Sequence, residues 1–187
     1  MNQLSSLVFG ILVLSLSTTI SSAAEFQSLS VTVPKGENLS VRIPPAWRHT
    51  VLQPAPNLPP TLKITTLSNS LSLQITFLPD PEGHFATRES ADRAATQANQ
   101  HYVAGSVEKR LTLTQIVSTN GHGCFATFTD ADLAGVPHPR PGEFKNVVSG
   151  LFVIKKQVAT FTLLTNDNKS AEYRQALQVI SDGISVP

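Results

Sequence analysis

Short stretches in which apolar and polar residues alternate predict that β-strands dominate this chain. In residues 71–78 the apolar side chains recur at every second position, as in a strand with one buried face: Leu71, Leu73, Ile75 and Phe77. Similar runs predict seven further strands, at 26–33, 38–43, 61–67, 107–118, 124–129, 145–154 and 158–165. Ser68-Asn69-Ser70 predicts a hairpin turn between two of them. The last two runs are the most apolar, and only Lys155-Lys156-Gln157 separates them, which predicts a central hairpin covered on both faces.

Two windows change to the spacing of an α-helix. Residues 87–102 carry a small apolar stripe, made of Ala91, Ala94, Ala95, Ala98 and Tyr102. Thr87 or Ser90 is the expected N-cap. The last window carries a second stripe, made of Tyr173, Ala176, Leu177, Ile180 and Ile184. Ser170 is its expected N-cap and Gly183 lies near its end, so both windows predict helices that cover a sheet.

The order of these elements sets the expected fold class. No strand–helix–strand alternation occurs, so the sheet should be mainly antiparallel. We expect an α+β fold in which a sheet of about seven to eight strands is covered by two principal helices. Residues 25–187 are expected to form a single domain. Two proline-rich segments, 44–60 and 134–143, are predicted to be irregular.

Three stretches of the chain, taken in order, form a pattern that is found in known exported proteins. The first is the opening strand followed by 39–47, which ends in Pro44-Pro45-Ala46-Trp47; the second is the middle helix ending at Tyr102, with the strands after it. The third is the closing hairpin followed by a last helix over 172–180. This pattern resembles PsbP-like and bacterial DcrB-like proteins, which implies a PsbP-like α/β/α sandwich and a non-catalytic accessory or partner-binding domain. We expect no cofactor. No motif matches a functional residue of these families, so none is carried over.

The amino terminus predicts export. Residues 7–16 are apolar apart from Gly10 and Ser15, and a Ser/Thr-rich segment then ends in Ser22-Ala23-Ala24. Small residues at the last and third-last positions suit signal peptidase, so 1–24 is predicted to be a signal peptide that is removed. The apolar run is too short to span a bilayer. Residues 1–6 contain no Lys or Arg, which departs from the usual signal-peptide pattern.

The charge content limits the classes of partner that this protein is expected to bind, and the cysteine content excludes an intrachain disulfide. Only 14% of the residues are charged and the formal net charge is +1, with no basic run, which argues against nucleic acid. Cys124 is the only cysteine, so no intrachain disulfide forms. We expect a periplasmic or secreted protein whose partner is another envelope or secreted protein.

The segment 121–126 matches the dinucleotide pattern G-x-G-x-x-A, but its context predicts a strand. Aromatic and β-branched residues follow it, whereas the dinucleotide motif needs a helix there. Asn120-Gly121 instead predicts a hairpin, because both residues tolerate positive φ.

His122 and Cys124 lie two residues apart, so an extended chain places both side chains on one face. One interpretation is a thiol-dependent hydrolase; another is a metal site completed by other histidines, such as His49, His84, His101 or His138. The favoured interpretation is a small buried thiol beside a turn histidine. The acidic residues are predicted to be solvated loop carboxylates rather than acid–base pairs or calcium ligands: Asp80, Glu82, Asp130 and Asp132.

Two segments are candidate partner-binding surfaces. The first contains Trp47, Arg48 and His49, and the second contains Pro137, His138, Pro139 and Arg140. Tryptophan and arginine are frequent binding anchors, and a proline-rich segment can be read as an extended ligand. In the alternative interpretation, Trp47 closes the end of the core while Arg48 and His49 face water, and the second segment is a stiff connector. The predicted function is therefore binding rather than catalysis, either as an accessory protein or as an inhibitor of a secreted enzyme.

Overall fold

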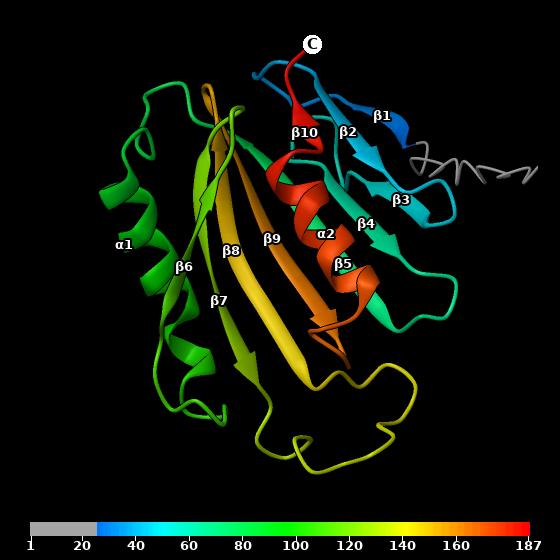
Figure 1. Ribbon diagram of the computed structural model, residues 1–187. Helices are drawn as coiled ribbons and strands as arrows, with labels where there is room; N and C mark the ends of the chain where they lie inside the picture. The colour runs from blue at the N-terminus through cyan, green and yellow to red at the C-terminus, as the bar shows by residue number, and fades with distance from the viewer. Residues whose placement is uncertain (1–25) are drawn as a thin grey trace, which may run out of the picture.

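The computed structural model describes residues 26–187, so the predicted signal peptide lies outside the described residues. Seven antiparallel strands form the main sheet in the order β3-β4-β5-β9-β8-β7-β6 (Figure 1). They are β3 (Arg48–Leu52), β4 (Thr61–Thr65), β5 (Leu71–Pro79), β6 (Leu113–Val117), β7 (His122–Thr129), β8 (Asn146–Ile154) and β9 (Gln157–Thr165). A smaller antiparallel sheet has the order β1-β2-β10 and consists of β1 (Gln27–Val31), β2 (Leu39–Ile43) and β10 (Ile184–Ser185). The helices are α1 (Arg88–Asn99), the 3₁₀ turn η1 (Gln100–Tyr102) and α2 (Ala171–Ser181).

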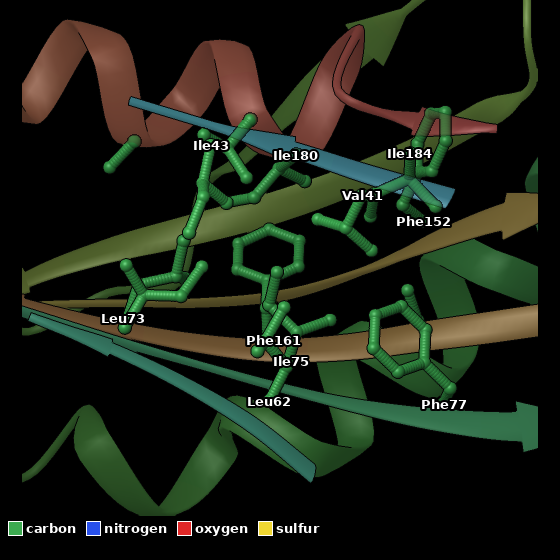
Figure 2. Close-up of a cluster of buried hydrophobic side chains, with 14 of the residues drawn as sticks. Val41, Ile43, Leu62, Leu73, Ile75, Phe77, Phe152, Phe161, Ile180 and Ile184 are labelled. Atoms are coloured by element: carbon green, nitrogen blue, oxygen red, sulfur yellow. The ribbon is translucent and has the colours of Figure 1, made fainter. Parts of the chain in front are cut away.

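The main core lies between one face of the main sheet and a layer made of β2 and α2. Side chains from both sides interdigitate there (Figure 2), among them Val41, Ile43, Leu73, Ile75, Phe77, Phe152, Phe161 and Ile180. Phe77 and Phe152 are completely buried. The alternation seen in 71–78 is confirmed, because Leu71, Leu73, Ile75 and Phe77 all belong to this core while Gln74 stays exposed. We call this face the inner face of the main sheet.

Helix α1 covers part of the opposite, outer face. Ala91 and Ala95 are buried against β7 and β8, together with Cys124, Leu151, Val153 and Val158. Thr87 is the N-cap and accepts a hydrogen bond from Ser90 N at 3.2 Å, as the sequence predicts. At the other end, the Asn99 side chain donates to the Ser149 carbonyl of β8. The predicted central hairpin forms as β8–β9, and its inner face is buried in the main core. On the outer face α1 covers β8, whereas Thr160, Thr162 and Leu164 of β9 stay half-buried, so the predicted covering of both faces holds only in part.

The structure corrects the sequence prediction at four places. The segment 44–60, predicted to be irregular, contains β3, and a second sheet accompanies the main one. The strand predicted at 107–118 is limited to Leu113–Val117. Ile184 belongs to β10 rather than to the last helix, because the Gly183 amide caps α2 by donating to Gln178 and Val179 carbonyls. Ile184 then pairs with Val41 of β2.

The Asn120-Gly121 hairpin forms as predicted, but for a different physical reason. Neither residue has a positive φ, so the turn does not use the conformational freedom of glycine. Instead, a Cβ at position 121 would lie 2.0 Å from the backbone oxygen of Val153. Glycine is required there because the chain passes so close to β8.

Gly121→Ala should therefore lower the free energy of unfolding by about 1–3 kcal/mol, since β8 has to move away from the new methyl group. Gly135→Ala is the matched control, because a Cβ there meets nothing within 4 Å; its effect should stay within about 0.5 kcal/mol. Urea unfolding of both variants measures the difference. Equal stabilities would contradict the proposed close approach.

Candidate functional site

The outer face of the main sheet is covered unequally. Helix α1 packs on β7 and β8, whereas the outer face of β3, β4, β5 and β9 carries polar side chains. Cross-strand register places Thr50, Lys63, Gln74 and Thr162 in one row across these four strands. The first three are exposed and Thr162 is half-buried. A row of polar side chains is therefore exposed beside α1.

Two adjoining hollows lie at one end of this surface. The larger, of about 600 Å³, is bounded by β4, the 68–72 turn and the loop that joins β7 to β8. The smaller, of about 360 Å³, is bounded by β3 and β4. Both are lined by Lys63, Thr65 and Asn69. We call the two together the basic groove and define it by Arg48, His49, Lys63, Thr65, Asn69, Pro139, Arg140 and Glu143.

Arg48 is fixed on the β3 side of the groove. Its guanidinium donates to the carbonyl of Thr66 at 3.3 Å and to the side-chain oxygen of Asn69. Asn69 adopts a left-handed conformation with φ 55°, which asparagine tolerates well. The predicted Ser68-Asn69-Ser70 turn is confirmed, and it holds the Arg48 side chain in place.

The opposite side of the groove is a loop pinned to the end of β9. Asn166 donates to the Glu143 carbonyl at 3.2 Å and accepts from the Lys145 amide at 2.9 Å. The Glu143 carboxylate accepts from the Arg140 amide at 2.9 Å, and the Glu143 amide donates to the Arg140 carbonyl. The 140–143 turn is thereby closed, which holds Arg140 at the rim.

The groove concentrates positive charge. Arg48, Lys63 and Arg140 face one carboxylate, Glu143, whereas the whole chain has a formal charge of only +1. Within residues 26–187, neither Lys63 nor Arg140 forms an ion pair through its side chain. The groove is therefore suited to anionic groups.

The structure separates the predicted partner-binding residues. Trp47 is only 7% exposed and belongs to the main core, while Arg48 and His49 are exposed and line the groove. In the second segment, Pro139 and Arg140 line the groove, whereas Pro137 and His138 are exposed on the loop outside its lining. The sequence did not identify Lys63 and Asn69 as candidate binding residues. A polar residue on the exposed face of a strand or in a turn is common in any protein, so its presence does not indicate a binding site.

The His122 and Cys124 side chains do lie on the same face of β7, under α1. Cys124 is completely buried. Burial raises the pKa of the Cys124 thiol to about 12, and Asp92 contributes to this shift through a hydrogen bond and through its negative charge. His122 is half-buried, and its Nε2 lies 3.3 Å from the Phe85 carbonyl. The thiol is thus protonated near neutral pH and shielded from solvent, which disfavours a nucleophilic role.

One of the acidic residues corrects the sequence prediction. Asp80 is 4% exposed rather than solvated, and its carboxylate accepts from the amides of His84 and Phe85. It fixes the turn that leads into α1.

Asp132 is exposed, and its amide donates to the Asp130 carboxylate at 2.9 Å. Within residues 26–187, no group of three or more His, Cys, Asp or Glu side chains is placed to hold a metal ion.

Comparison with solved structures supports the expected architecture. The chain is similar to the solution structure of cyanobacterial PsbP (CyanoP) from Synechocystis sp. PCC 6803, with a TM-score of 0.52 and 12% sequence identity. The match covers 92% of this chain and 99% of that chain. The chain has a PsbP-like fold. No family model and no curated protein matches the sequence.

Both helices lie against strands: α1 packs on β7 and β8, and α2 packs on β2 and β5. Across the described residues, neither helix has the length and apolar character needed to cross a membrane.

Cys124 in this PsbP-like fold should react slowly with a thiol reagent. At pH 8 we expect native Cys124 to react at least about 100-fold more slowly than the same thiol in urea, because it is buried and protonated. Following absorbance of the released chromophore measures both rates. Equal rates would reopen the thiol-dependent interpretation.

The same pKa shift predicts a pH dependence of stability. The folded thiol keeps its proton up to about pH 12, whereas the unfolded thiol loses it near its ordinary value of 9.0. The unfolded state therefore binds fewer protons in this window, and the free energy of unfolding falls as pH rises from about 9 to about 12. Cys124→Ala should lack this part of the fall, which urea unfolding across the window measures.

Proposed function

We propose that this chain is an exported, non-catalytic accessory protein that binds another envelope or secreted protein through the basic groove. The observation that carries this proposal is the meeting of two segments far apart in sequence. Arg48 and His49 line one hollow, Pro139 and Arg140 line the next, and both hollows share Lys63 and Asn69. Export rests on the predicted signal peptide 1–24, and the PsbP-like fold agrees with an accessory role.

The charge of the groove indicates the chemistry of the partner. Three cationic side chains converge there, and the single carboxylate is already engaged with a backbone amide. A partner segment with carboxylates on an extended or loop backbone complements this surface. Asn69 and Thr65 add polar groups that can hydrogen-bond to such a segment.

The alternative of a thiol-dependent hydrolase has less support. Such an enzyme needs an accessible thiolate beside a base, whereas Cys124 is buried and its pKa is raised. The inhibitor interpretation uses the same surface and differs only in the partner, so it is tested by the same experiment.

Reversing two charges in the groove tests the proposal. Lys63→Glu with Arg140→Glu should reduce recovery of the partner from an envelope extract by about tenfold or more, because like charges then oppose the acidic segment. The control, Lys155→Glu with Lys156→Glu, makes the same charge change in the exposed turn at the opposite end of β9. It should recover the partner as the unmodified protein does.

The same partner must be identified in all samples by mass spectrometry. Recovery unaffected by the groove variant, or reduced equally by the control, would exclude the groove as the contact surface. Loss of activity of a recovered enzyme on adding the protein would identify the inhibitor form of the function.

A further inference from the structure

Strand β3 forms one edge of the main sheet and has a free side. Among the strands of residues 26–187 it pairs only with β4, and all five of its residues are exposed. Val51 is 45% exposed and Leu52 is 50% exposed, so an apolar end follows the basic end at Arg48 and His49. Edge strands of this kind can add a strand from another chain unless they are blocked by proline, a bulge or a covering segment.

Hydrogen bonds between β4 and β5 show which residues of β4 bond to β3, and therefore which residues of β3 have unpaired backbone groups. Thr66 N donates to Leu71 O, and Phe77 N donates to Pro60 O. Hydrogen-bonded pairs alternate along an antiparallel ladder, so residues 62 and 64 bond to β5 while 61, 63 and 65 bond to β3.

The pairing of β3 with β4 then shows which backbone groups of β3 point toward the free edge. Arg48, Thr50 and Leu52 are opposite the residues of β4 that bond toward β3. His49 and Val51 therefore direct their amide and carbonyl groups away from β4. No side chain or turn within residues 26–187 hydrogen-bonds to these groups.

We propose that the free edge of β3 binds an extended strand of a partner protein, with acidic residues opposite Arg48 and His49 and apolar residues opposite Val51 and Leu52. This inference rests on the proposed function, because the acidic end of the added strand lies in the basic groove. Backbone hydrogen bonds at His49 and Val51 supply general affinity, and the charge pattern along β3 sets which end of the strand lies in the groove.

Two synthetic peptides test the inference by NMR on the purified protein: Ser-Ile-Val-Thr-Glu-Glu-Ser and its reverse sequence, which suit antiparallel and parallel addition. Binding of one peptide should slow hydrogen exchange of the His49 and Val51 amides by about tenfold or more. Val51→Pro removes one outward amide and should weaken binding by about tenfold or more. Val51→Ala keeps that amide and is the matched control, with a smaller loss.

Methylated peptides give a second test that leaves the protein unchanged. In the antiparallel peptide, N-methylation of the residues opposite His49 and Val51 should abolish binding, whereas N-methylation of the residue opposite Thr50 should not. Binding without protection of these amides and without sensitivity to methylation would overturn strand addition but keep the groove as a binding site. Failure of both peptides to bind would also overturn it, and the charge-reversal experiment would then decide the groove separately.

Discussion

The burial of the inner face of the main sheet against β2 and α2 is the interaction on which the rest of the structure depends. Phe77, Phe152 and Ile180 are almost fully removed from water there. Each such side chain contributes about 1.5–3 kcal/mol by burial. Because this layer includes β1 and β2 near the beginning and α2 and β10 at the end, the first and last strands of the described chain lie in one sheet (Figure 1).

The outer face of the main sheet is only partly covered, in contrast to the inner face. The small alanine side chains of α1 let the helix lie close to β7 and β8, where Cys124 fills part of the contact. The helix does not extend over β3 and β4, and there the outward positions are threonine, lysine and arginine, with Leu52 at the end of β3. The outer face of β3 and β4 thus presents mainly polar groups to solvent.

Trp47 links the core to the candidate binding surface. Its side chain is buried in the main core directly before β3 begins, so the edge strand starts from a fixed point. Arg48 and His49 follow on the surface, and the Arg48 side chain is held by the 66–69 turn. The position of Trp47 thus agrees with the interpretation in which it closes the end of the core while Arg48 and His49 face water. The proposed binding surface uses these two exposed residues and not the tryptophan itself.

The chain's own pattern determined the elements that have a buried face. Residues 71–78, the central hairpin and the two capped helices were predictable because burial imposes a local period. Strand β3 was not, because every residue of an exposed edge strand faces solvent and leaves no alternation. The second sheet was missed because β10 has only two residues, too few to show a period. Only the tertiary structure decided that Lys63 lies between Arg48 and Arg140, since strand order depends on pairing between distant segments, which no local pattern records.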